Sequence, residues 1–422
     1  MLLAGALFRH LRLPALRQSP IMDEVSVNVP KDRSVTLILS HKCNLACSYC
    51  YQRAEWRDSA LMSLPLAQKL LEKEFSKVPE GGSLGIVLMG GEPFVEWPLF
   101  RSLCEWILAR EWPRPFRIVV STNGTLVAGE IKDWLKRHKD RIILGLSYDG
   151  NGEMQEENRH TGQFNIDLPF FLETWGRQGV KMTLSPQTVG TLFDGLKYLH
   201  EECGMGHGFR SDTSMDENAI GCNLAYGVDF GKEDYLALKR ELAKCVEWYL
   251  SDGKDYTPAT ILNLDLSYCP PEVNPGTVHK YCGVGTAMVC YDVDGTEYPC
   301  QFFLPLTQPV DNLRHIPEFD FAGDVGDPAC RSCPIETLCP TCYGNNFLRT
   351  GNPFVRDKTL CPFFKLIFLA NCILQTRRLL PKRDKTDKEI YSLRVIQKIY
   401  PRLLEEVERH EAGWFGANPP TP

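Results

Sequence analysis

The first half of the chain alternates short apolar stretches with longer amphipathic ones. Strands are predicted at residues 34–40, 84–89, 117–121, 141–147 and 180–185, and helices at 97–110, 130–138, 168–178 and 192–203. Each strand stretch is apolar enough to be buried on both faces, as parallel strands covered by helices are. The repeated β–α units therefore predict an α/β fold whose parallel sheet is either open or closed as a barrel.

The pattern changes after a helix predicted at residues 232–251. From about 270 to 361, short strands, glycine and proline turns and closely spaced cysteines replace the helical periodicity. Helices return at 362–380 and 388–410. We expect five segments: an N-terminal extension (1–33), the β–α repeat (34–230), a bridging region (231–269), a cysteine-rich domain (270–365), and C-terminal helices with a tail (366–422).

Charge and cysteine content narrow the class of protein. The net charge is −6 and no dense Lys/Arg block occurs, so no nucleic-acid partner is expected. The apolar stretch at the N-terminus lacks a preceding basic region and is too short to span a bilayer, which argues against a signal peptide and against a membrane protein. Seventeen cysteines without a secretory signal indicate a cytoplasmic, metal-binding chain rather than a disulfide-bonded one.

Three cysteines lie in one short polar loop directly after the first predicted strand. They are Cys43, Cys47 and Cys50. Clusters of the 4Fe–4S type are usually held by four Cys thiolates, so three thiols in one loop leave one iron open for another ligand. The alternative is three ordinary core cysteines. It fits poorly with a polar loop at a strand end, where the catalytic groups of β–α barrels lie.

This spacing, Cys-x3-Cys-x2-Cys with the aromatic Tyr49 before the last cysteine, resembles the signature of the radical S-adenosylmethionine (SAM) enzymes. The resemblance implies a partial (β/α)6 barrel of the TIM type and a cluster whose open iron chelates the amino and carboxylate groups of SAM. It also implies an activity: reductive cleavage of SAM releases a 5′-deoxyadenosyl radical, which abstracts a hydrogen atom from the substrate.

Three later strand ends resemble further parts of that family. The segment Gly90-Gly91-Glu92-Pro93 is similar to the one that meets the methionyl amino group, since bare glycines allow close approach of a ligand. An ordinary turn before a proline is the alternative. The next two strand ends are Ser121-Thr122-Asn123-Gly124 and Ser147-Tyr148-Asp149-Gly150, the latter followed by Arg159.

In the family these turns meet the ribose and the carboxylate of SAM, and arginine pairs naturally with a carboxylate. Ser121 is therefore implied near the ribose, and Ser147 and Arg159 are implied to hold the ribose or the carboxylate. The full set of SAM contacts implied by the resemblance is Tyr49, Gly90, Gly91, Glu92, Ser121, Asn123, Ser147 and Arg159.

Seven cysteines form a second group downstream: Cys282, Cys300, Cys330, Cys333, Cys339, Cys342 and Cys361. Their layout resembles the SPASM domain, which carries two auxiliary 4Fe–4S clusters and would bring the total to three. The resemblance assigns Cys282, Cys300 and Cys342 to the first auxiliary cluster. It assigns the other four to the second. A zinc ribbon built from the two Cys-x-x-Cys pairs is the alternative, but it leaves three cysteines unexplained.

The first auxiliary cluster lacks an obvious fourth ligand, and only two residues separate Cys339 from Cys342, where three are usual. Cys269, which a proline follows, is one candidate, and an open iron is the other. Cys290, expected inside a strand at 287–292, ranks behind both. Among the remaining cysteines, Cys104, Cys203, Cys245, Cys290 and Cys372 are expected in the core, and Cys222 in a turn without a role.

Auxiliary clusters indicate electron handling, and hence a net oxidation. Enzymes that combine a radical SAM barrel with a SPASM domain mostly modify peptides or proteins. They either crosslink side chains of ribosomally made precursors or make formylglycine in sulfatases. Sulfatase maturases carry an Asp after the Tyr-Pro-Cys turn as a proposed base. Here Gln301 follows Cys300, and an amide does not take a proton. Asp292 and Asp294 are the candidate substitutes.

We therefore expect a radical SAM peptide maturase that forms carbon–carbon or thioether crosslinks. Anaerobic sulfatase maturation is the alternative, and a non-catalytic zinc-ribbon interaction protein is the alternative of another class. The expected partners are a precursor peptide and an electron donor such as flavodoxin or ferredoxin. Leader recognition would use the barrel mouth, residues 205–268 or a separate leader-binding protein. No membrane partner is expected.

Overall fold

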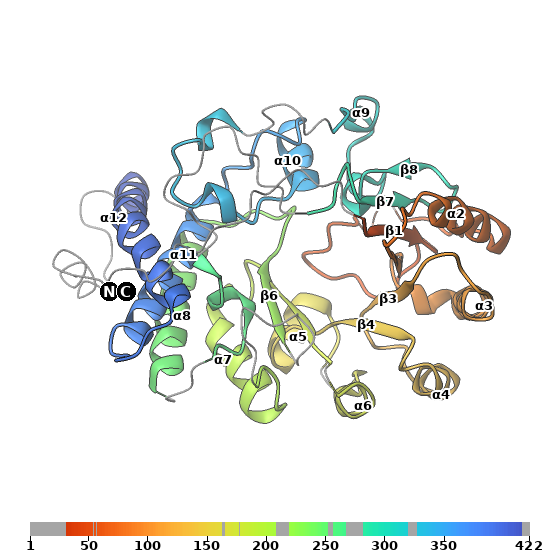
Figure 1. The fold of residues 1–422 in the computed structure, drawn as a ribbon, viewed down its shortest axis with the longest axis horizontal. Helices are drawn as coiled ribbons and strands as arrows, with labels where there is room; N and C mark the ends of the chain where they lie inside the picture. Colours follow the sequence, from red (N-terminus) through yellow and green to blue (C-terminus); the bar gives the residue numbers. More distant parts are fainter. Residues whose placement is uncertain are drawn as a thin grey trace.

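A computed structural model describes residues 31–415, apart from 54, 56, 163–164, 177, 208–218, 252–255, 267–281 and 320–326. One eight-stranded sheet runs through the described part, in the order β6-β5-β4-β3-β2-β1-β7-β8 (Figure 1). Its first six strands are β1 (Arg33–Ile38), β2 (Leu84–Met89), β3 (Phe116–Thr122), β4 (Ile142–Ser147), β5 (Val180–Leu184) and β6 (Ile220–Leu224). These six are parallel and lie side by side in chain order, which confirms the partial (β/α)6 barrel.

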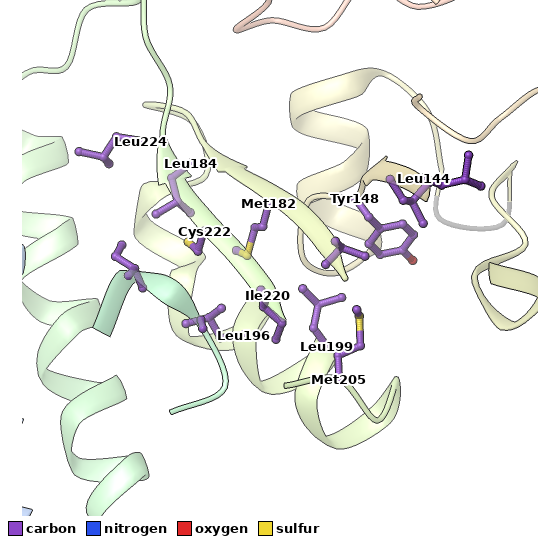
Figure 2. Packing of buried hydrophobic residues seen from close by; sticks show 14 of the residues in the cluster. Leu144, Tyr148, Met182, Leu184, Leu196, Leu199, Met205, Ile220, Cys222 and Leu224 are labelled. Carbon is purple, nitrogen blue, oxygen red and sulfur yellow. The ribbon is translucent and has the colours of Figure 1, made fainter. Parts of the chain in front are cut away.

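The sixth strand corrects one expectation from the sequence. Cys222 lies in β6, between Ile220 and Leu224, and not in a turn. Gly221 and Asn223 give this stretch the composition of a turn, yet every second residue is buried against the core, as in a strand. Figure 2 shows Cys222 and Ile220 among the apolar side chains that pack beneath β5 and β6.

Helices follow the strands and cover the outer face of the sheet. They are α2 (Leu64–Ser76), α3 (Trp97–Leu108), α4 (Gly129–Arg137), α5 (Gly152–Arg159), α6 (Leu168–Thr174) and α7 (Leu192–Lys197), which continues as a π-helical turn at Tyr198–Glu202. In α3 the buried residues recur at helical spacing and include Cys104, as expected. The sequence did not indicate α2 or α5. Helix α2 begins after Ser63, whose side chain accepts a hydrogen bond from Leu66 N.

The two faces of the barrel strands differ in burial. In β2 the buried residues are Leu84, Ile86 and Leu88, and the residues between them are only partly buried. On β4, Ile143 is 51% exposed. The expectation of burial on both faces is therefore wrong for the inner face. Helices cover the outer face alone, and the first and last barrel strands, β1 and β6, do not pair to close the barrel.

The cysteine-rich region extends the barrel sheet, which the sequence did not indicate. Strand β7 (Met288–Tyr291) pairs in parallel with β1, with Thr36 opposite Cys290, and β8 (Glu297–Tyr298) pairs antiparallel with β7. Cys290 is fully buried there, as expected for a core cysteine. Beyond this hairpin the region contains α9 (Val310–Leu313), α10 (Tyr343–Thr350) and short 3-10 turns.

Three long helices form one end of the molecule (Figure 1). They are α8 (Lys232–Ser251), α11 (Cys361–Leu379) and α12 (Asp387–Phe415), and all three match predicted helices. Helix α11 packs against both others, and Cys245 of α8 and Cys372 of α11 are fully buried, as expected. Within the described residues, no helix has both the length and the apolar character needed to cross a membrane.

Candidate cluster and cofactor site

The cysteine loop after β1 lies directly against the end of β2. Gly91 N donates to Ser40 O (3.0 Å), and Glu92 N donates to Lys42 O (2.9 Å). A Cβ added to Gly90 would lie 2.4 Å from Ser40 O, and one added to Gly91 would lie 2.3 Å from Lys42 O. The close approach of these two backbone segments therefore requires both glycines, whereas the resemblance implies glycines that admit a ligand.

The loop presents three half-buried free thiols, those of Cys43, Cys47 and Cys50. Leu45 N donates to Cys43 Sγ (3.4 Å), and Arg57 Nη2 donates to Cys50 Sγ (3.2 Å). Burial raises the pKa of Cys43 and raises that of Cys47 to about 11, and the neighbouring cysteines add to both shifts. Thiolates at these positions therefore need added positive charge, which iron ions supply.

The spacing of donor groups bears on the kind of metal. Among the residues that the structure describes, no three His, Cys, Asp or Glu side chains are grouped to hold a single metal ion. A zinc ion about 2.3 Å from each thiolate needs sulfurs about 4 Å apart. A 4Fe–4S cluster binds each thiolate through a different iron and so accepts a wider spread.

Glu92 joins the ends of β2 and β3 from inside the protein. Its carboxylate accepts from Thr122 Oγ1 (2.8 Å), Asn123 N (2.8 Å) and Phe94 N (3.2 Å). Burial raises the pKa of Glu92 to about 7, although these three donors each lower it. Glu92 is 1% exposed, so its carboxylate is engaged by protein atoms at the place where the resemblance implies a SAM contact.

A closed set of side-chain bonds connects the cysteine loop to the end of β3. Asn123 Nδ2 donates to Asn44 Oδ1 (3.0 Å), and Asn44 Nδ2 donates to Thr125 Oγ1 (2.7 Å). Thr125 Oγ1 in turn donates to Asn123 Oδ1 (2.7 Å). Asn44 and Thr125 were not predicted from the sequence, where their only signal is a polar residue beside Cys43 and another beside the Thr-Asn-Gly turn.

At the end of β4, Asp149 is buried and accepts several hydrogen bonds. Its Oδ2 accepts from Tyr49 Oη (2.6 Å) and Arg159 Nε (2.7 Å), and its Oδ1 accepts from Thr183 N (2.7 Å). Burial alone would lower the pKa of Arg159, but Asp149 raises it overall. Arg159 also lies 5.5 Å from the centre of the Tyr49 ring. The structure therefore commits Arg159 to a buried ion pair that fixes Tyr49 of the cysteine loop to β4.

Ser121 and Ser147 lie at the carboxyl ends of β3 and β4, and both are half-buried. Ser121 is in register with Gly145, so Ser147 lies one inward-facing position further along β4. Neither hydroxyl belongs to the bonded networks around Glu92 and Asp149. Of the implied SAM contacts, these two serines keep the most accessible polar groups.

A second group of thiols lies near Tyr51. The Tyr51 ring stacks on Phe302, with ring centroids 4.1 Å apart. Burial raises the pKa of Tyr51 well above its usual value, and the neighbouring cysteines add to the shift: Cys50, Cys290, Cys300 and Cys342. Tyr51, the chain neighbour of Cys50, therefore packs in the same apolar cluster as Cys300 and Cys342, two cysteines that the resemblance assigns to the first auxiliary cluster.

The cysteines implied for that first auxiliary cluster lie near one another. Cys300 is buried, Cys342 is half-buried and Cys282 is exposed. Burial raises the pKa of Cys300, and Cys342, Cys290 and Cys282 add to this shift. The candidate fourth ligand, Cys269, lies outside the described residues.

The cysteines implied for the second auxiliary cluster also lie together. Cys330, Cys333 and Cys361 line a cavity of about 710 Å³ between the cysteine-rich region and α12. Lys358 Nζ donates to Cys330 Sγ (3.0 Å). Burial raises the pKa of the adjacent Cys339 to about 12, and the other three cysteines contribute to the shift. A lysine beside these sulfurs suits the negative charge of cluster thiolates.

The two acids that the sequence offered as substitute bases are both engaged. Asp292 Oδ1 lies 2.7 Å from His41 Nε2, in a buried contact, and His41 Nδ1 lies 2.8 Å from Asp58 Oδ1. Asp294 is bonded within its own turn, where it accepts from Thr296 N and Thr296 Oγ1, both at 2.8 Å. Neither carboxylate is therefore placed as a free base.

Comparison with known proteins identifies the class. Residues 37–151 match the sequence model of the Radical SAM superfamily, so the chain carries a radical SAM domain. It is similar to the antilisterial bacteriocin subtilosin biosynthesis protein AlbA of Bacillus subtilis, with 30% identity over 131 residues, 31% of this chain and 27% of AlbA. It is also similar to a serine-type anaerobic sulfatase-maturating enzyme of Klebsiella aerogenes, with 28% identity over 154 residues, 35% of this chain and 37% of that enzyme.

Solved structures share the fold over a longer stretch. The structure of anSMEcpe with bound AdoMet superposes with a TM-score of 0.59 at 18% identity, and the match covers 89% of this chain and 98% of that one. Streptococcus suis SuiB bound to its precursor peptide SuiA gives a TM-score of 0.52 at 17% identity, covering 78% and 75% of the two chains. The matches to the two curated relatives, by contrast, span only 27–37% of those proteins' length.

Proposed function

We propose that this chain is a radical SAM peptide maturase that crosslinks side chains of a ribosomally made precursor peptide through a carbon–carbon or thioether bond. The position of Tyr51 carries the proposal. Tyr51 directly follows Cys50 of the barrel loop, and its side chain packs in one apolar cluster with two cysteines of the cysteine-rich domain, Cys300 and Cys342. A pair of neighbouring redox sites suits a net oxidation, because crosslinking removes two hydrogens from the peptide for each bond formed.

The residues present fit the cofactors that this reaction needs. Cys43, Cys47 and Cys50 would hold a 4Fe–4S cluster, and Ser121 and Ser147 would contact SAM from the inner face of the barrel. SAM, when bound, would supply the 5′-deoxyadenosyl radical that abstracts hydrogen. The auxiliary clusters would be held by Cys282, Cys300 and Cys342, with Cys269 or an open iron as the fourth position, and by Cys330, Cys333, Cys339 and Cys361.

The chain's own contribution is to hold the reacting groups in place. Hydrogen bonds from Glu92 N to Lys42 O, from Asn123 Nδ2 to Asn44 Oδ1 and from Tyr49 Oη to Asp149 fix the cysteine loop to the ends of β2, β3 and β4. Buried networks of this kind keep their geometry when a substrate binds, because breaking them leaves polar groups unsatisfied. The loop therefore forms a rigid base, and the half-open inner face leaves room for the peptide.

Named relatives support a peptide substrate. AlbA is named for the biosynthesis of a bacteriocin, and SuiB was solved with its precursor peptide bound. Both observations belong to those proteins, and they favour the same class of substrate for this chain. We extend the proposal to its partners: an electron donor such as flavodoxin or ferredoxin, and a leader-binding protein if the barrel does not read the leader itself. A cytoplasmic location follows from the reduced thiols that the clusters need.

Formylglycine formation in a sulfatase is the second candidate, and the likeness to sulfatase-maturating enzymes favours it. The contacts of this chain weigh against it. Gln301 occupies the position of the proposed base, Asp292 is bonded to His41, and Asp294 is bonded to Thr296. We therefore rank crosslinking first.

Metal analysis and SAM cleavage test the proposal at its base. Anaerobically purified protein should contain about twelve irons, four for each of three clusters, with matching sulfide. It should also form 5′-deoxyadenosine under dithionite. Replacing Cys43, Cys47 and Cys50 together by alanine should abolish that product. Stoichiometric zinc without iron, or undiminished cleavage by the triple variant, would overturn the proposal.

A further inference from the structure

Lys181 is the one lysine of the six parallel strands. It lies in β5, opposite Ser147 of β4 and Gly221 of β6. Its neighbours Val180 and Met182 are buried on the outer face, so Lys181 points to the inner face. Its side chain is exposed to solvent, whereas the rest of β5 is buried. The barrel therefore directs a solvent-accessible ammonium group inward.

No carboxylate within the described residues forms an ion pair with Lys181. Asp149, the carboxylate that interacts with its charge, already accepts from Tyr49, Arg159 and a backbone amide. The protein atoms packed around its ammonium lower the pKa of Lys181, although the side chain keeps access to solvent, and Arg159 lowers it further, while Asp149 and Cys342 act in the opposite direction. The ammonium is thus a charge held among protein groups without a partner of its own.

The inner face therefore carries an unbalanced positive charge at this point. Arg159 is neutralised by Asp149, which leaves the charge of Lys181 as the surplus. This charge interacts with Asp149, just after β4, with Arg159 at the end of α5, and with Cys342 of the cysteine-rich domain. A ligand that reaches from the SAM-contact serines toward the first auxiliary site would pass this ammonium group.

We propose that Lys181 binds a carboxylate on the inner face of the barrel. Two ligands of a radical SAM peptide maturase offer one: the methionyl carboxylate of SAM, and an acidic side chain of the peptide. The first source requires only the radical SAM domain, while the second rests on the proposed function. Arg159, which the resemblance implied for a carboxylate, is committed to Asp149, and Lys181 is the accessible cation that remains nearby.

The test measures binding to the iron-loaded protein under anaerobic conditions. The variants are Lys181→Met, which keeps the length of the side chain, and Lys181→Arg, which keeps the charge. The first arm compares the Kd of SAM with that of decarboxylated SAM. The second compares two labelled synthetic peptides by fluorescence anisotropy, acetyl-Gly-Glu-Cys-Glu-Gly-amide and its counterpart with Gln in place of Glu.

Loss of one charge-assisted hydrogen bond should weaken carboxylate binding by roughly tenfold or more. If SAM supplies the carboxylate, Lys181→Met should bind SAM roughly tenfold more weakly than the wild type does, or weaker still, and should bind decarboxylated SAM as tightly as the wild type does. Lys181→Arg should recover most of the affinity for SAM. If the peptide supplies the carboxylate, the same pattern should appear for the Glu peptide against the Gln peptide.

Lys136→Met, at the last turn of α4 on the outer side, is the matched control and should change neither arm. The proposal would be overturned if Lys181→Met, with iron content and circular dichroism like the wild type, kept the wild-type preference for SAM over decarboxylated SAM and for the Glu peptide over the Gln peptide. A positive SAM arm would stand even if no crosslinked peptide were ever found, so failure of the proposed function is distinguishable from failure of this inference.

Discussion

His41 Nε2 and Asp292 Oδ1 lie 2.7 Å apart in a buried contact that joins the two halves of the protein. His41 begins the cysteine loop of the barrel, and Asp292 directly follows β7 of the cysteine-rich region. A second carboxylate, that of Asp58, lies 2.8 Å from the other ring nitrogen. Although burial would lower the pKa of His41, these two carboxylates raise it overall. The contact therefore sets the position of one candidate cluster region against the other.

Removing this contact should destabilise the whole protein. Asp292→Ala leaves a buried His41 without one of its two partners, so the apparent melting temperature should fall by roughly 5 °C or more. Asp294→Ala, two residues away, removes only a bonded turn carboxylate and is the control. Differential scanning fluorimetry under anaerobic conditions gives both values. Equal melting temperatures for the two variants would show that the buried contact between His41 and Asp292 does not stabilise the protein.

The ion pair of Arg159 and Asp149 predicts a stability effect that a pure ligand contact would not have. Arg159→Leu leaves the buried carboxylate of Asp149 without its counter-charge and should reduce the free energy of unfolding by about 3 kcal/mol. Adding Asp149→Asn to this variant should recover part of the loss, because the uncompensated charge is then gone. Urea denaturation followed by circular dichroism measures both. If Arg159→Leu were as stable as the wild type, the ion pair would not stabilise the fold, and Arg159 would be a SAM contact alone.

The buried carboxyl group of Glu92 predicts how stability depends on pH. Its pKa is raised from the ordinary 4.5 to about 7 in the folded protein. The folded state therefore binds more protons than the unfolded state between these values, so this stabilising contribution is complete below about pH 4.5 and is lost as pH rises through about 7. The loss amounts to about 3 kcal/mol.

Glu92→Gln removes this titration while keeping a side chain of the same size. The stability of the wild type relative to this variant should therefore fall as the pH rises from 5 to 8. Glu130→Gln, at an exposed site on α4, provides the comparison and should show no such trend. A constant difference between wild type and Glu92→Gln across this range would mean that Glu92 stays ionised throughout.

Much of the fold was accessible from the sequence because its signals are local. Strand β2 and helix α8 have the bounds that were predicted, since an apolar run and a helical period are read from neighbouring residues. Strand β6 was missed because Gly221 and Asn223 mask its period of two. The pairing of β7 with β1 joins residues about 250 positions apart, and no local pattern encodes such a contact.

The site shows the same division. Cysteine spacing predicted which thiols share a loop or a region, and the structure brings the described members of each set together. The partners of those loops were not predicted. Arg57, Asn44 and His41 act through side-chain contacts that only the folded chain creates. Likewise, the sequence showed Arg159 in a family motif but not its commitment to Asp149.

The auxiliary clusters should act after hydrogen abstraction. Cys333 lines the cavity beside α12, in the region downstream of the barrel and its cysteine loop. Cys333→Ala should therefore keep some SAM cleavage while losing crosslinked product, as judged by chromatography of 5′-deoxyadenosine and mass spectrometry of the peptide. Cys104→Ala, in the core of α3, is the matched cysteine control. Product at the wild-type rate from folded Cys333→Ala would show that the second auxiliary cluster is dispensable.

The mass of a co-expressed peptide tests the central claim most directly. The gene should be expressed anaerobically with each short open reading frame encoded beside it, and the peptides analysed by tandem mass spectrometry. Our account predicts the loss of two hydrogens per modification, with no fragmentation between the linked residues and no reaction with a hydrazine. Loss of two hydrogens at a single Ser, or replacement of sulfur and two hydrogens by one oxygen at a single Cys, in a peptide that does react with a hydrazine would contradict crosslinking and indicate formylglycine instead.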